Sequence, residues 1–128
     1  MKQKVETSNA PKAAGPYSQA IIAGNMIFTS GQVYLTPDGK LLEGSIEEQT
    51  HQVMKNLQAV LESAGVTFAD VVKTTIYVTD MSNYGKINEI YGSFFTDPYP
   101  ARETVCVAGL PLGAVLEISM IAIKPESI

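Results

Sequence analysis

One long amphipathic helix, marked at both ends, restricts the possible folds of this chain more than any other feature. Ser45 and Glu48 have the S-x-x-E spacing of a capping box, which predicts the start of a helix, and Gly65 predicts its end. Between them, apolar residues recur at intervals of three and four positions and predict one buried face about five turns long. These residues are Val53, Leu57, Val60, Leu61 and Ala64.

A second helical pattern begins near Ser82 and is stopped by the prolines of the segment Asp97-Pro98-Tyr99-Pro100. Four residues in it repeat at the helical period: Tyr84, Ile87, Tyr91 and Phe94. Because this spacing is typical of the side of a helix that faces a core, we interpret the tyrosines and the phenylalanine as packing residues.

Other segments are rich in β-branched and apolar residues, which predicts strands. They are Gln19 to Ala23, Met26 to Ser30, Val71 to Thr79, Glu103 to Ala108 and Val115 to Ile123. Gly24-Asn25 predicts a tight hairpin turn between the first two, and Gly109 to Gly113 predicts a loop between the last two. The predicted order is β-β-β-α-β-α-β-β, in which the hairpin supplies two of the three strands before the first helix.

This order predicts an α+β fold in one domain, residues 1–128, with a mixed sheet and both helices packed on one face. The other face of the sheet then needs a cover. Its candidate side chains mix apolar residues with Thr and Ser, which suits a protein–protein interface better than open solvent. We therefore expect an oligomer, whose copy number does not follow from the layers.

Several classes of function are not expected. The first ten residues, MKQKVETSNA, contain no apolar segment that could act as a signal or membrane anchor, so we expect a cytoplasmic protein without a membrane partner. Cys106 and His51 are the only residues of their types, which argues against a disulfide, a structural metal site and a metal cofactor.

The charge balance argues against a nucleic-acid partner. Thirteen acidic and nine basic residues give a net charge of -4, which repels phosphate backbones unless the basic residues cluster. The lysines are scattered from Lys2 to Lys124, and the aromatic residues are not interleaved with them as a nucleic-acid stacking platform requires.

Arg102 is the only arginine, and it follows Pro100-Ala101 at the entrance to a predicted strand. A guanidinium held there could bind the carboxylate of an acid substrate through two parallel hydrogen bonds. A surface or intersubunit ion pair remains the alternative.

Glu117 lies within an apolar run, Ala114 to Ile118, and strand alternation places it on the same face as Val115 and Ser119. It is either a general acid/base whose pKa is raised by burial or an acid at a wet sheet edge.

Four further features have weaker signals. The turns Gly15 to Ser18 and Thr29 to Gln32 could present hydroxyls and N–H groups to a small anion, or could simply reverse the chain. His51 is out of phase with the core face of its helix and is expected in solvent. Cys106 has no basic partner and is expected to be a buried small hydrophobic residue.

Taken together, five short motifs in chain order resemble those of the reactive-intermediate deaminase family (Rid, also called YjgF-like). They are GPYS at Gly15 to Ser18, SGQ at Ser30 to Gln32, PAR at Pro100 to Arg102, LP at Leu110-Pro111 and LEI at Leu116 to Ile118. The resemblance extends over nearly the whole chain and identifies it as similar to the RidA-like members.

The resemblance implies a chorismate-mutase-like α+β fold and a homotrimer with ligand sites between subunits. It also implies hydrolysis of 2-enamine and 2-imine acids, such as 2-aminoacrylate and 2-iminobutanoate, to 2-keto acids and ammonia, without a cofactor. By similarity, Arg102 binds the substrate carboxylate, Glu117 positions and activates water, Tyr17 packs on the substrate, and Ser30 and Gly31 line the pocket.

The chain departs from the family pattern at three positions near these residues. Glu103 stands where the family more often has a small or apolar residue, and strand alternation points it away from Arg102. Thr104 replaces a frequent cysteine at a substrate-binding position that the family uses largely through its backbone carbonyl. Ser119 replaces a second acid often found two residues after Glu117.

Two alternatives to a deaminase remain open. The same residues could bind a keto acid or amino acid as a signal, without turnover. Some relatives are described as translation inhibitors or ribonucleases, although the acidic balance and single arginine argue against that function here.

Overall fold

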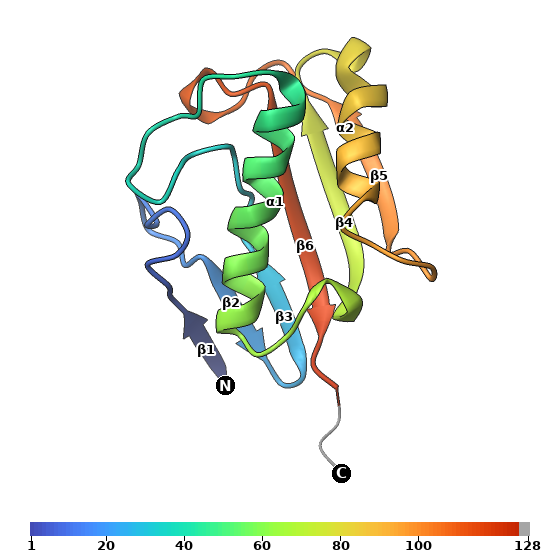
Figure 1. Ribbon diagram of the computed structural model, residues 1–128. Coiled ribbons are helices and arrows are strands. Elements are labelled where there is room, and N and C mark those ends of the chain that lie inside the picture. Colours follow the sequence, from blue (N-terminus) through green and yellow to red (C-terminus); the bar gives the residue numbers. More distant parts are fainter. Residues whose placement is uncertain (126–128) are drawn as a thin grey trace.

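The computed structural model describes residues 1–125 and contains one six-stranded sheet with two helices on one of its faces (Figure 1). The helices are α1 (Ile46–Ser63) and α2 (Tyr84–Gly92). The strands are β1 (Lys2–Val5), β2 (Ala20–Ala23), β3 (Met26–Thr29), β4 (Val71–Val78), β5 (Ala101–Cys106) and β6 (Leu116–Ile123). Their order across the sheet is β1-β2-β3-β6-β4-β5.

The predicted element order is confirmed, and β1 is the strand for which the sequence suggested no range. β2 and β3 form the predicted hairpin, with Ala23 opposite Met26 and Gly24 at a φ of 62° in the turn. β4 and β5 are parallel, whereas the other neighbouring strands are antiparallel. The sheet is therefore mixed, as predicted.

α1 begins with the predicted capping box. The Ser45 hydroxyl accepts a hydrogen bond from the Glu48 N–H at 3.1 Å, and the Glu48 carboxylate accepts one from the Ser45 N–H at 3.0 Å. All the predicted core residues of this helix are buried: Val53, Leu57, Val60, Leu61 and Ala64. Gly65 follows at a φ of 86°, the left-handed conformation that ends many helices.

α2 is shorter than predicted, because it ends at Gly92 and Phe94 lies beyond it. Phe95, not Phe94, is buried, with its ring 4.8 Å from the ring of Tyr91. The residues after Gly92 form a turn, in which Phe94 is partly buried against the core.

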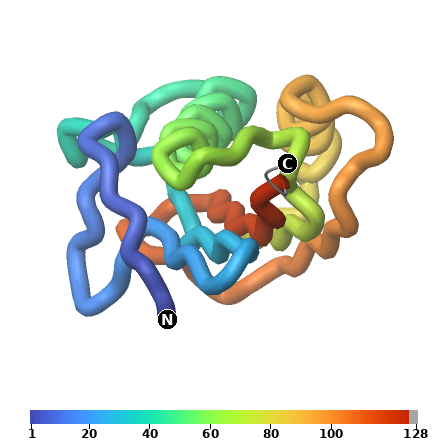
Figure 2. The backbone as a smooth tube through the Cα atoms, turned by 90° about the horizontal axis from the view of Figure 1, so that it is seen from below, coloured from blue at the N-terminus to red at the C-terminus, as the bar shows by residue number. Residues whose placement is uncertain are grey.

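The two faces of the sheet differ in cover. In β6, Leu116, Ile118, Met120 and Ala122 are buried beneath the helices, while the intervening residues are partly exposed on the opposite face. Viewed along the sheet, both helices lie on one side, and none of the described residues forms a layer on the other (Figure 2). We call this uncovered side the open face. The chorismate-mutase-like α+β architecture is confirmed, and the trimer remains a prediction.

β5 corrects two expectations. The strand starts at Ala101, two residues before the predicted start, so Arg102 lies within it. Cys106 was expected to be buried and is exposed, because it ends an edge strand that has a neighbour on one side only. None of the helices within residues 1–125 is long and apolar enough to cross a membrane.

Candidate functional site

Glu117 lies in a pocket of about 500 Å³ on the open face. The pocket, here called the glutamate pocket, is lined by Tyr17, Ser30, Gly31, Pro111, Leu112 and Glu117, among others. The carboxylate is half-buried, and this burial raises its pKa above the ordinary glutamate value. A carboxyl group with a raised pKa in an open pocket can take up and release a proton.

Gly31 brings the backbone up against the Glu117 side chain. A Cβ at position 31 would lie 2.5 Å from Glu117 Oε2, closer than van der Waals contact allows. The segment is held there by Gln32, which exchanges two backbone hydrogen bonds with Ile118, at 2.9 and 3.1 Å. A glycine at this position therefore leaves the space that the carboxylate occupies.

Ser30 and Tyr17 add hydroxyl groups to the lining of this pocket, which also includes Lys12, Gln19 and Gln32. The Ser30 hydroxyl donates to the Ser18 carbonyl at 2.5 Å, so its oxygen can only accept from a ligand. Tyr17 is 54% exposed, and its hydroxyl accepts a bond from the Ala14 N–H at 3.3 Å. The structure thus brings together four predicted site residues: Tyr17, Ser30, Gly31 and Glu117.

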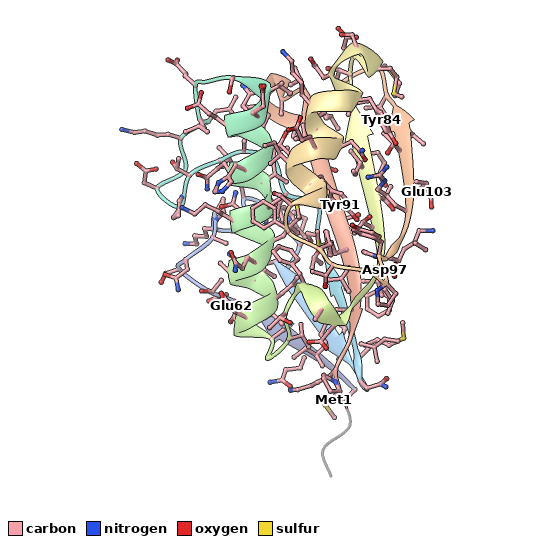
Figure 3. The ribbon with its side chains drawn as sticks, turned by 45° about the vertical axis from the view of Figure 1, so that its right-hand side comes forward. Met1, Glu62, Tyr84, Tyr91, Asp97 and Glu103 are labelled. Atoms are coloured by element: carbon pink, nitrogen blue, oxygen red, sulfur yellow. The ribbon has the colours of Figure 1, made fainter. Side chains whose placement is uncertain are left out.

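Arg102 lies in a separate pocket of about 430 Å³, here called the arginine pocket. It is lined by Asn88, Tyr91, Gly92, Tyr99, Pro100 and Arg102. The guanidinium donates from Nη1 to Asn88 Oδ1 and from Nη2 to the Tyr84 hydroxyl, both at 2.7 Å. Figure 3 shows α2 beside β5, with Tyr84 at the start of the helix and Tyr91 near its end.

Tyr91 fixes the inner wall of the arginine pocket. Its ring centroid lies 5.0 Å from Arg102 Cζ, and its hydroxyl shares a buried hydrogen bond of 2.8 Å with Thr74 Oγ1. Burial raises the pKa of Tyr91, while the bond with Thr74 and the charge of Arg102 act in the opposite direction. Tyr91 is therefore a neutral aromatic surface for the guanidinium at neutral pH.

The sequence predicted only packing roles for Tyr84 and Tyr91 and indicated no role for Asn88, and both interpretations were incomplete. All three contact Arg102, which lies 14 and 18 positions from Asn88 and Tyr84. Their spacing of four and three positions puts them on one side of α2. A side of a helix that only packs against a core needs apolar residues. The two tyrosines and the asparagine on this side could therefore have indicated a polar contact.

The two pockets lie on opposite faces of the sheet. Arg102 is paired with Thr74, whose side chain is buried beneath α2. Glu117 is paired with Tyr77, three positions further along β4 and therefore on the other face. Arg102 and Glu117 cannot contact the same small ligand within one chain.

The remaining predicted site positions have different surroundings. Thr104 shares the face of Arg102, and its hydroxyl is buried without a hydrogen-bond partner among residues 1–125. Glu103 points away from Arg102, as predicted, and forms a 2.7 Å ion pair with Lys73 on the open face.

His51 is exposed, as predicted, with its ring 5.3 Å from that of Phe94. Within residues 1–125, no group of three or more His, Cys, Asp or Glu side chains is arranged to hold a metal ion.

Comparison with known proteins gives consistent matches over nearly the full chain. The family model described as endoribonuclease L-PSP matches residues 7–124. Reactive Intermediate Deaminase A of the chloroplast of Arabidopsis thaliana is 48% identical over 122 residues, which cover 94% of this chain and 65% of that protein. The 2-iminobutanoate/2-iminopropanoate deaminase of Mus musculus is 43% identical over 125 residues, which cover 97% and 93% of the two chains.

Among solved structures, a putative endoribonuclease from Thermotoga maritima superposes with a TM-score of 0.95 at 49% identity. The superposition covers 98% of this chain and 100% of that one. The relatives therefore share the complete fold and bear two different functional names.

Proposed function

This chain belongs to the endoribonuclease L-PSP family as a member similar to the reactive-intermediate deaminases, and we propose that it hydrolyses 2-enamine and 2-imine acids to 2-keto acids and ammonia. The observation that most supports this proposal is the half-buried Glu117 with its raised pKa in an open pocket. Hydrolysis of an imine is accelerated by a positioned group that accepts a proton from water and passes it on.

The proposal includes an assembly in which two chains build each site. Arg102 and Glu117 lie on opposite faces of one sheet, so a ligand that contacts both needs the arginine pocket of one chain and the glutamate pocket of another. The open face, with Phe28 and Ile123 about 40% exposed, supplies an apolar contact surface for such copies. We propose a homotrimer with sites between the subunits.

In each site, Arg102 binds the substrate carboxylate. Its guanidinium has five N–H donors and is charged throughout the physiological range of pH. Tyr17 and the Ser30-Gly31 turn enclose the remainder of a small acid, and Thr104 contributes through its backbone.

Glu117 then acts on the water. As the water oxygen bonds to the imine carbon, the Glu117 carboxylate accepts a proton from it and passes this proton to the nitrogen. In the resulting carbinolamine, the hydroxyl proton passes through Glu117 to the amino nitrogen as the C–N bond breaks, which releases ammonia and leaves the keto group. Proton transfer by a positioned side chain of this kind contributes about 10²–10⁴-fold in rate, and no step requires a cofactor.

A turnover measurement tests this function. Freshly generated 2-iminobutanoate should disappear faster with the protein than in buffer, with equal amounts of 2-oxobutanoate and ammonia formed. A wild-type protein that binds 2-oxobutanoate without accelerating imine loss would instead support a binding module for small acids.

The name of the family model makes an endoribonuclease the second candidate. Thirteen acidic against nine basic residues and a single arginine, which is held beside Tyr84 and Asn88, do not favour binding to an RNA backbone. Cleavage of a labelled RNA, with binding measured at rising salt concentration, distinguishes this activity from imine hydrolysis.

A further inference from the structure

The Arg102 guanidinium is held from one side before any ligand arrives. It has five N–H donors, and two of them are bonded to the side chains of Asn88 and Tyr84. Three N–H groups therefore remain for a carboxylate, which is enough for a two-point contact. The side chains that take the other two decide how the guanidinium plane is oriented.

Tyr84 and Asn88 hold the guanidinium in unequal ways. The bond from Nη2 to Tyr84 is partly buried, whereas the bond from Nη1 to Asn88 is exposed and competes with water. The Tyr84 ring centroid also lies 5.6 Å from Arg102 Cζ, so this residue contacts the guanidinium through both its ring and its hydroxyl. Because its hydrogen bond is partly shielded from water and its ring also contacts the guanidinium, Tyr84 should fix Arg102 more firmly than Asn88 does.

We infer that Tyr84 is a positioning residue whose hydroxyl orients Arg102 for the substrate carboxylate. This inference rests on the proposed function for its consequence in catalysis, although the contact itself does not. An arginine that is oriented in the free protein loses less rotamer freedom when it binds, so the hydroxyl should act on capture of the acid. Tyr84 bonds to the guanidinium and not to the group that transfers the proton, so kcat should be unaffected.

Tyr84→Phe tests the inference because it removes one oxygen and leaves the ring. We expect the KM for 2-iminobutanoate and the Kd for 2-oxobutanoate to rise by about threefold to tenfold, the range of a lost, partly exposed hydrogen bond. The kcat and the thermal midpoint of unfolding should stay near the wild-type values. Ser82→Ala also removes one oxygen, from an exposed residue just before α2 that lines neither pocket, and should leave both constants near wild type.

A double-mutant cycle shows whether Tyr84 acts through Arg102. In an Arg102→Lys background, the lysine lacks the planar fork that bonds to Tyr84, so Tyr84→Phe should change the Kd for 2-oxobutanoate by less than about twofold. An undiminished effect in that background would mean that Tyr84 acts on the ligand or the fold directly, and the inference would be overturned.

A measurement that needs no turnover separates this inference from the proposed function. Arg102 is the only arginine, so a sample labelled with ¹⁵N-arginine gives a single side-chain Nε–H signal. Tyr84→Phe should speed rotation of the guanidinium and hydrogen exchange at this group. If neither the signal nor the Kd changes, the positioning role is wrong. If the signal changes while the wild type shows no turnover, only the deaminase proposal fails.

Discussion

Arg102 and Glu117 project from opposite faces of one sheet, Arg102 beneath α2 and Glu117 on the open face. Each has its own pocket, and each pocket is open to solvent in the single chain. Under the proposed function these pockets are two half-sites, and six predictions follow from this arrangement and from the contacts that support it.

Mixing two inactive variants should restore activity. Arg102→Ala and Glu117→Gln each disable one half-site, and a site built from two chains is intact when each chain supplies its unaltered half. In a random one-to-one mixture, each of the two chains at a site has an even chance of supplying the unaltered residue. About a quarter of the sites are therefore intact, in cyclic and in two-fold assemblies. Co-refolded variants should therefore regain about a quarter of the wild-type rate. A mixture as inactive as its components would rule out the shared site.

Arg102→Lys should keep the fold and assembly but lose most deaminase activity. A lysine keeps the charge but cannot form two parallel bonds to a carboxylate, and it also loses the bonds to Asn88 and Tyr84. Sedimentation and rate measurements on the same sample test both parts. Wild-type rates in this variant would refute carboxylate binding by the guanidinium fork.

Glu117→Gln should lower kcat more than it raises KM, because the amide has nearly the same shape but cannot accept a proton. The loss should be about 10²–10⁴-fold, with binding of 2-oxobutanoate retained. Rates on 2-iminobutanoate and calorimetric titration with 2-oxobutanoate separate the two effects. If Glu117→Gln turned over at the wild-type rate, the proposal that Glu117 activates water would be wrong.

The same substitution predicts a dependence of stability on pH. Burial raises the pKa of Glu117, so the folded chain retains this proton to higher pH than the unfolded chain does. Between the two pKa values the folded state binds more protons, so stability falls as pH rises. Glu117→Gln should be at least as stable as wild type at neutral pH, and this advantage should vanish below about pH 4. Urea titrations at both pH values test the sign.

Gly31→Ala should reduce activity with little loss of stability. The new methyl group would lie 2.5 Å from Glu117 Oε2 and 2.6 Å from its Cδ, so the flexible carboxylate must move away. A displacement of this size can reduce the rate by about 10²-fold. Gly85→Ala is a matched control, since a Cβ there has no neighbour within 4 Å. It should leave activity unchanged and stabilise α2 by about 0.5–1 kcal/mol.

Asn56→Ala should destabilise the chain by about 1–3 kcal/mol. The buried Asn56 amide donates to the carbonyls of Val33 at 3.2 Å and Leu35 at 2.7 Å. It thereby fastens the segment after the Ser30-Gly31 turn to α1, and alanine leaves both carbonyls without this donor. Gln58→Ala, on the exposed side of the same helix, should change the free energy of unfolding by less than about 0.5 kcal/mol in urea titrations.

The sequence alone determined the elements whose signals are local. The capping box joins Ser45 to Glu48, the hairpin turn depends on Gly24, and the alternation of β6 is visible within eight residues. Each pattern depends on backbone geometry over a few positions, so it can be recognised without knowledge of the tertiary structure. The end of α2 was missed by the same reasoning, because the aromatic residues of the following turn imitate the helical period.

Only the tertiary structure decided in which pocket each candidate site residue lies. The family motifs implied that Arg102 and Glu117 act on the same substrate. The order and register of the strands put the two side chains on opposite faces of the sheet. Likewise, Tyr84 meets Arg102 across 18 positions, and Gly31 meets Glu117 through the pairing of Gln32 with Ile118. Contacts between residues so far apart depend on which strands are neighbours and in which register, and no local periodicity encodes that arrangement.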